Sequence, residues 1–149
     1  VGTSVNDSKF LFPLIKEYGV EENFISVGIV PPIELSKYLA NAHVGISLVS
    51  KTSYYLTSPP QKLFEYLSMG LPVIVNDVPT HKQYIKHQRT GMVIGDNVDE
   101  FVDSVLLLKK NRKLYNEISS NTKILSDKYD ISKVRKLMLN FLLKFESEN

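Results

Sequence analysis

A single acid, Glu65, lies in a largely apolar stretch that the pattern predicts to be a helix. Proline is favoured at the first position of a helix, so Pro59 and Pro60 mark its start. The free N–H groups of a helix's first turn attract anions, and here Gln61, Lys62 and the preceding loop must supply the donors. A carboxylate accepts hydrogen bonds and can take two from the cis hydroxyls of a ribose. These residues suit a nucleotide, with phosphate at the helix start and ribose on Glu65.

A second interpretation of Glu65 is an ion pair with Lys62 on an exposed helix face. Such pairs are common and contribute about 0.2–0.5 kcal/mol. Leu63, Phe64 and Leu67 form the predicted buried face, and Glu65 lies away from it on the side of Gln61. Spacing alone leaves both interpretations open.

Other chemistry finds little support in the sequence. His43, His81 and His87 lie far apart without ligand spacing, so we predict no metal site and no cofactor. The chain lacks the G-x-S-x-G, G-x-G-x-x-G and Walker A patterns, and we assign no catalytic residue. A net charge of +2 without a basic stripe interleaved with aromatics argues against a nucleic-acid partner.

The composition bounds the class of protein. The 149 residues, 43% hydrophobic and 23% charged, predict one globular domain. The absence of cysteine excludes disulfides and favours a reducing, cytoplasmic location. No apolar run is long enough to span a bilayer. We read the start at Val1 as a cut within a longer protein, the alternative being a processed N-terminus.

Short apolar runs alternate with amphipathic stretches, which predicts an α/β fold with a Rossmann-like, doubly wound parallel sheet. The expected strands are Phe24–Val30, Val44–Val49, Pro72–Val75 and Met92–Ile94. The expected helices are Lys9–Tyr18, Ile33–Ala42, Gln61–Met69, His81–His87, Glu100–Lys110, Leu114–Lys128 and Ile131–Phe145. Lys51–Thr57 reads as a loop.

Particular residues are expected to begin or end these elements. Pro13 fits the first turn of the first helix, Asp99 fits a helix cap, and Gly70 fits a helix stop. The C-terminal helices should pack on the sheet, the alternative being that their basic residues face an anionic membrane. Ligands of such sheets bind at the carboxyl ends of the strands, after Val30, Val49 and Asp77.

Several stretches, in order, resemble the nucleotide-sugar-binding domain of GT-B glycosyltransferases, in the retaining group called glycosyl transferases group 1, or family four. The best match is PPQKLFEYLSMGLPVIVNDVP. The stretches VGTS, GIVPPIELSKYLANAHVGISLVS, RTGMVI and DEFVDSVLLLKKN also resemble family segments. The likeness covers nearly the whole chain, so residues 1–149 are expected to be the C-terminal donor-binding half of a two-domain enzyme.

The resemblance implies transfer of a sugar from a nucleoside diphosphate to an acceptor hydroxyl, as in polysaccharide or glycan synthesis. It places the donor ribose on Glu65, the diphosphate or sugar on the loop Leu56–Ser58, which includes Thr57, and the base on the loop at Val30. With Lys62 from the helix start, these are the expected nucleotide-sugar-binding residues. It implies no metal, an N-terminal acceptor domain outside this chain, and a donor half that is inactive alone. An acceptor held in a membrane would place the enzyme peripherally at its inner face.

The chain departs from the family pattern at three points. Many members carry two glutamates spaced E-x(7)-E, and Thr57 replaces the first of them. The turn before Thr90 lacks its usual glycine, and Gln83 replaces a common acid. Two alternatives remain: a non-catalytic, flavodoxin-like binding module, and half of a nucleotide-sugar epimerase.

Overall fold

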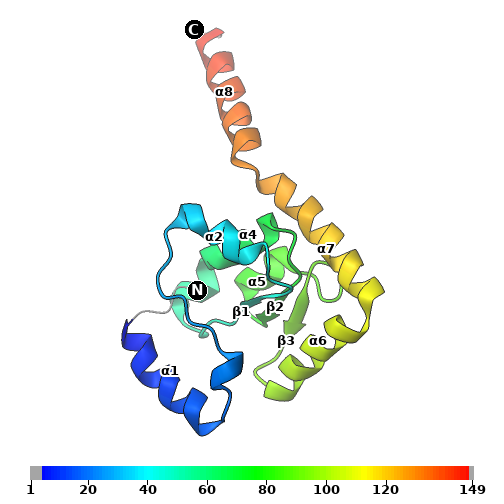
Figure 1. The fold of residues 1–149 in the computed structure, drawn as a ribbon. Coiled ribbons are helices and arrows are strands. Elements are labelled where there is room, and N and C mark those ends of the chain that lie inside the picture. Colours follow the sequence, from blue (N-terminus) through cyan, green and yellow to red (C-terminus); the bar gives the residue numbers. More distant parts are fainter. Residues whose placement is uncertain (1–4, 148–149) are drawn as a thin grey trace. The chain divides into compact units, whose positions relative to one another are not determined.

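The computed structural model describes residues 5–147 (Figure 1). The chain divides into two compact units, Val1–Asn41 and Ala42–Asn149, and each is described by itself. Among the described residues, no helix is both long and apolar enough to cross a membrane.

The first unit contains helix α1 (Val5–Glu17), a short 3-10 turn η1 (Glu21–Asn23) and helix α2 (Pro32–Leu39). Pro13 lies inside α1 rather than in its first turn, because the helix begins earlier than its apolar pattern predicted. Because proline has no N–H, α1 lacks one of its internal hydrogen bonds at that position.

The strand predicted for residues 24–30 does not form. The segment leaves η1 in non-helical conformation and pairs with no strand among the described residues. Ile25 and Ile29 are 81% and 78% exposed. An apolar run becomes a strand only where a neighbour satisfies its backbone groups, and no strand of residues 5–147 does so here.

The second unit is built on a parallel sheet with the strand order β1-β2-β3. Its strands are β1 (Gly45–Ser47), β2 (Val73–Asn76) and β3 (Met92–Ile94), and they confirm three of the predicted strands. Ile74 is opposite Ile46 on one side and Met92 on the other, which fixes the register. All of β2 is buried, as expected for the central strand of a covered parallel sheet.

Helices cover both faces of this sheet (Figure 1). The helical elements of this unit are α3 (Ser53–Thr57), α4 (Gln61–Ser68), α5 (Pro79–Tyr84), α6 (Val98–Lys110), α7 (Arg112–Ser126), the 3-10 turn η2 (Asp127–Tyr129) and α8 (Ile131–Ser147). Alternate residues of β2 serve the two cores, since Val73 and Val75 pack with α4 while Ile74 packs with α6 and α7.

Several boundaries differ from the prediction. Residues 53–57 form α3 instead of continuing the loop, because Thr57 Oγ1 donates to the backbone oxygen of Ser53 and stabilises that turn. Helix α5 begins at Pro79, with proline in its first turn, and ends before the predicted limit. Asn97 rather than Asp99 caps α6, its Oδ1 accepting from Asp99 N at 2.8 Å.

The C-terminal helices behave differently from one another. Leu108 of α6 and Ile118 of α7 are buried against the sheet, as predicted. Leu137 and Met138 of α8 are instead 69% and 62% exposed, so these residues of α8 do not join that core.

Gly70 ends α4 with φ +68°, which confirms the predicted helix stop.

Candidate donor-binding site

The carboxyl ends of β1 and β2 are joined by one side chain. Asn76, the last residue of β2, accepts from Val49 N at 3.1 Å and donates to Val49 O at 2.8 Å. The amide thus satisfies both backbone groups of a residue just beyond β1. This connection fixes the loop that leads from β1 to α3 and α4.

His81 completes the connection from inside the protein. Its ring is fully buried, with Nδ1 3.0 Å from Asn76 O and Nε2 3.2 Å from Ser47 Oγ. Burial lowers the pKa of the His81 imidazole, and the ring is held in its neutral form. His81 therefore positions the strand ends, a role that its spacing in the sequence did not reveal.

Helix α4 starts at this same edge. Pro60 precedes it without a side-chain cap, and Leu63 N bonds back to Pro60 O at 3.0 Å. The N–H groups of Gln61 and Lys62 have no acceptor within the described part of the chain. Two donors remain at the positive end of the helix dipole, as the sequence predicted for an anion site.

Lys62 lies half-buried on this first turn and forms no ion pair with any described residue. Burial lowers the pKa of its ammonium group. The charge of Lys62 contributes in turn to the lowered pKa of His81, which places the start of α4 beside the β2–α5 connection. An unpaired, partly desolvated cation is a suitable partner for a phosphate.

Glu65 is half-buried, and its carboxylate has no hydrogen-bond or ion-pair partner among residues 5–147. The ion pair with Lys62 that the spacing left open is therefore absent. Burial, and secondarily the charge of Glu65, raise the pKa of the Tyr66 phenol. The carboxylate keeps its capacity to accept hydrogen bonds from a ligand.

In the loop before α4, more hydrogen-bonding groups are already used within the protein than we predicted. The Thr57 hydroxyl donates within α3, to Ser53 O at 3.1 Å or to Tyr54 O at 3.2 Å, and Ser58 N donates to Tyr54 O at 2.9 Å. The Ser58 hydroxyl has no hydrogen-bond partner among residues 5–147. Thr80 Oγ1 donates to Tyr55 O at 2.6 Å and fixes α3 to α5.

The predicted site residues thus divide into two groups. Ser58 and Lys62 lie at the start of α4, Glu65 lies about one turn further along that helix, and Thr57 ends α3 just before them. Val30 is half-buried in the first unit, and its role towards a base stays a prediction.

A hollow of about 460 Å³ lies at the carboxyl ends of all three strands. Leu48, Asn76, Ile94 and Phe101 are among its lining residues, and no predicted site residue is. Lys51 and Asp96 form an ion pair between the β1 and β3 loops. The strand topology predicted a crevice at this edge of the sheet, but the sequence analysis did not identify the side chains that line it.

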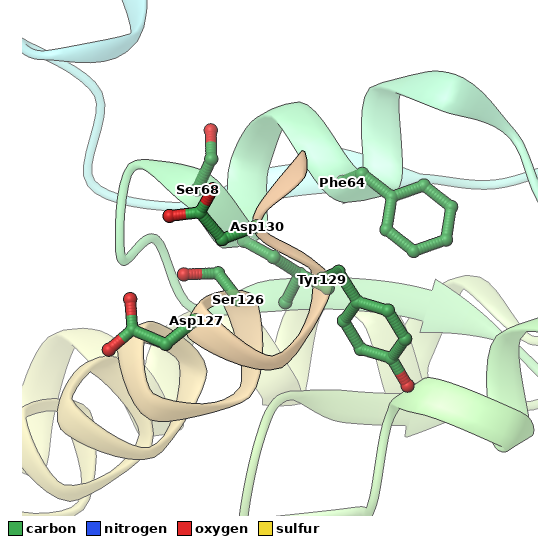
Figure 2. A pocket seen from close by; sticks show the side chains of 7 residues that line it. Phe64, Ser68, Ser126, Asp127, Tyr129 and Asp130 are labelled. Carbon is green, nitrogen blue, oxygen red and sulfur yellow. The ribbon is translucent and has the colours of Figure 1, made fainter. Parts of the chain in front are cut away.

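A second hollow, of about 350 Å³, lies between α4 and the end of α7. Figure 2 shows the rings of Phe64 and Tyr129 on one side and the oxygens of Ser126 and Asp127 on the other. The ring centroids of Phe64 and Tyr129 are 6.0 Å apart in an edge-to-face arrangement. This hollow contains none of the residues that the sequence assigned to a ligand.

Residues 1–124 match the profile of the family described as Glycosyl transferases group 1. An uncharacterized glycosyltransferase of Haemophilus influenzae is 31% identical over 77 residues, and the beta-1,6-galactofuranosyltransferase WbbI of Escherichia coli K12 is 36% identical over 77 residues. Each alignment covers 50% of this chain and 22% of the relative, so the matched segment is a minor part of those proteins.

Solved structures show the same fold. Anabaena HepE in complex with UDP superposes with a TM-score of 0.76 at 16% identity, covering 93% of this chain and 37% of HepE. The C-terminal domain of the Francisella tularensis group 1 protein LpcC gives 0.69 at 16% identity, covering 83% and 62%. The protein belongs to the glycosyl transferases group 1 family and has the Rossmann-like fold of a C-terminal GT-B domain.

Proposed function

We propose that this domain binds the nucleoside-diphosphate part of a sugar donor at the start of α4, for retaining hexosyl transfer to an acceptor hydroxyl. One observation carries the proposal. A half-buried ammonium, Lys62, and a half-buried carboxylate, Glu65, lie without described partners on a helix start that has two free N–H groups. Opposite charges that lie three positions apart without described partners are suited to a ligand that is anionic at one end and hydroxylated at the other.

Each group has a role in this arrangement. The N–H groups of Gln61 and Lys62, the Lys62 ammonium and the Ser58 hydroxyl would bind phosphate oxygens. Glu65 would accept from the two ribose hydroxyls, one helical turn further along. Thr57 would flank the sugar through its oxygen lone pairs, since its hydrogen is used within α3. Val30 would contact the base.

The chemistry follows from this placement. As the bond between the sugar and the diphosphate breaks, its electron pair goes to the diphosphate, and the acceptor oxygen bonds to the sugar and passes its proton to the departing diphosphate. Fixed N–H groups and the Lys62 ammonium stabilise the growing negative charge without reorganisation. We propose that no metal or cofactor is needed for this stabilisation, and we assign no catalytic base to this chain.

The proposal includes a second, acceptor-binding domain and a transfer step in glycan or polysaccharide synthesis, at the cytoplasmic face of a membrane where the acceptor is lipid-linked. Related structures support a UDP-linked donor, since HepE was solved with UDP and with UDP-glucose. We expect the present domain alone to transfer no sugar. A glycosyl-transfer assay on the isolated chain checks this, and turnover would contradict it.

The binding site is tested by calorimetric titration with UDP, GDP and ADP. Glu65→Ala should weaken binding by about 1–3 kcal/mol, the usual effect of removing a charged hydrogen-bond partner. Glu117→Ala, an exposed acid on α7, is the matched control and should bind like the unchanged protein.

The assigned role of Glu65 is separated from a general charge effect by 2′-deoxy-UDP. The unchanged protein should bind 2′-deoxy-UDP more weakly than UDP, and Glu65→Ala should bind the two equally. A Glu65→Ala protein that still prefers UDP would show that another group reads the ribose. No binding of any nucleoside diphosphate at millimolar concentration would overturn the proposed site.

A further inference from the structure

A third hollow, of about 250 Å³, lies between the segment after α5 and the end of α7. Lys86, Arg89 and Lys128 line it, and its lining contains no acid. Its other lining residues include Gln83, Thr90 and Asn121, which are polar and uncharged. None of the three cations forms an ion pair with another described residue, and the Lys86 ammonium donates one hydrogen bond, to Lys82 O at 3.0 Å. The hollow is therefore a concentrated positive site.

The backbone that carries Arg89 is held in an unusual conformation. Gln88 has φ +55°, in the left-handed region that residues other than glycine seldom adopt. This is the turn where the family resemblance led us to expect a glycine. Gln88 N bonds to Gly91 O at 2.7 Å, and Thr90 N bonds to Lys86 O at 2.9 Å, so the turn is closed internally. Strain of this kind persists where the surrounding structure enforces it, and it often accompanies function.

Two side chains of helix α7 donate hydrogen bonds to the backbone of the same turn. Asn121 Nδ2 donates to Arg89 O at 3.0 Å, and Thr122 Oγ1 donates to Thr90 O at 3.2 Å. These bonds hold the backbone under Arg89 against the helix that leads to Lys128. The cations are thus brought together by fixed main chain from two distant parts of the sequence.

The position of the hollow separates it from the proposed donor site. Thr90 lies two residues before β3, at the amino edge of the sheet, whereas the donor site lies at the carboxyl edge. We propose that Lys86, Arg89 and Lys128 form a second anion site that binds a phosphate group. Arg89 supplies the planar fork that matches phosphate oxygens, and the lysines supply point charges. The phosphate comes either from an anionic lipid headgroup or from a small soluble phosphate.

The test uses the whole chain and two probes. One probe is vesicles of phosphatidylcholine with or without phosphatidylglycerol, measured by co-sedimentation, and the other is inorganic pyrophosphate, measured by NMR titration. Removing each basic residue near an anionic surface weakens binding about fivefold, so Arg89→Gln/Lys128→Gln should lose about 25-fold. Lys109→Gln/Lys110→Gln on α6 makes the same change in net charge away from the hollow and should lose less than about twofold.

Two of the possible results identify the source of the phosphate, and two others would overturn the proposal. Loss of phosphatidylglycerol-dependent binding in the Arg89/Lys128 variant alone identifies a lipid headgroup. Loss of the pyrophosphate shifts at Thr90 and Asn121 in this variant, without vesicle binding, identifies a soluble phosphate. Arg89→Lys keeps the charge and should retain vesicle binding if the thermal midpoint shows it folded. Equal losses in both double variants, or no binding of either probe, would overturn the proposal.

Discussion

The position of α4, and with it Lys62 and Glu65, depends on a close approach between Gly45 of β1 and Tyr66. A Cβ atom built on Gly45 would lie 2.4 Å from Cγ and Cδ2 of the Tyr66 ring and 2.9 Å from its Cβ. Carbon atoms in contact are separated by about 3.5–4.0 Å, so Gly45→Ala requires the ring or the helix to move by about 1 Å. Glycine is therefore needed in β1 because another element lies directly on it.

The effect of Gly45→Ala on stability can be estimated from its effects on the folded and the unfolded state. Inserting a methyl group into a packed site costs about 1–3 kcal/mol, and replacing glycine reduces unfolded-state entropy and returns about 0.4–1 kcal/mol. We expect Gly45→Ala to lower the free energy of unfolding by up to about 2.6 kcal/mol. Because the two shortest contacts are with ring atoms, Tyr66→Ala should relieve most of the clash and leave only the 2.9 Å contact with the Cβ of residue 66. The double variant should be more stable than the sum of the single effects by about 0.5–3 kcal/mol.

Urea denaturation of the four proteins measures this coupling, with the midpoint read by circular dichroism. UDP titration of Gly45→Ala should also show weaker binding, because a shift of α4 displaces both charged groups of the proposed site. Gly70→Ala, strained at φ +68° but with no contact closer than 3.8 Å, serves as a control, since Tyr66→Ala should not rescue it. Strictly additive costs for Gly45→Ala and Tyr66→Ala would refute the reasoning.

Three further predictions concern the elements that support the site. Asn76→Ala removes both hydrogen bonds to Val49 and should lower the free energy of unfolding by about 1.5–3 kcal/mol in urea denaturation, whereas an unchanged midpoint would show that the bonds contribute nothing. The folded-state pKa of His81 is lowered, so the unfolded chain binds more protons below about pH 6.5. Stability should fall as pH decreases through that range, and His81→Asn should reduce the slope in thermal unfolding, while an unaltered slope would contradict this assignment. Leu63→Ala should cost about 2–5 kcal/mol because Leu63 is fully buried, while Leu137→Ala on α8 should cost under about 0.5 kcal/mol, and equal costs would contradict the assigned core.

Local patterns were enough for most of the second unit. The apolar runs at Val73–Asn76 and Met92–Ile94 became strands because each is short, apolar and bounded by residues that interrupt helices. Pro60 and Gly70 limited α4 because their backbone preferences act locally. The run at 24–30 had a similar pattern and failed, because a strand also needs a neighbour that local sequence does not specify.

The candidate site was also predicted in part. Residue types identified Glu65 and Lys62 at a helix start and left their mutual ion pair open. The folded chain decided that question, since neither charge has a described partner. It also showed that the Thr57 hydroxyl is already used within α3. Hydrogen-bond competition of this kind depends on which backbone oxygens lie within reach.

The sequence by itself determined the fold class, the family pattern and the helix that carries the proposed donor site, because periodicity, helix ends and short motifs act over a few residues. Only the tertiary structure decided which distant groups meet. It joined Asn76 to Val49, buried His81 between two strand ends and gathered Arg89 and Lys128 around one hollow. Asn76 and Val49 are 27 positions apart in the sequence, and Arg89 and Lys128 are 39 positions apart. Contacts of this kind form only when the sheet and its helices pack together.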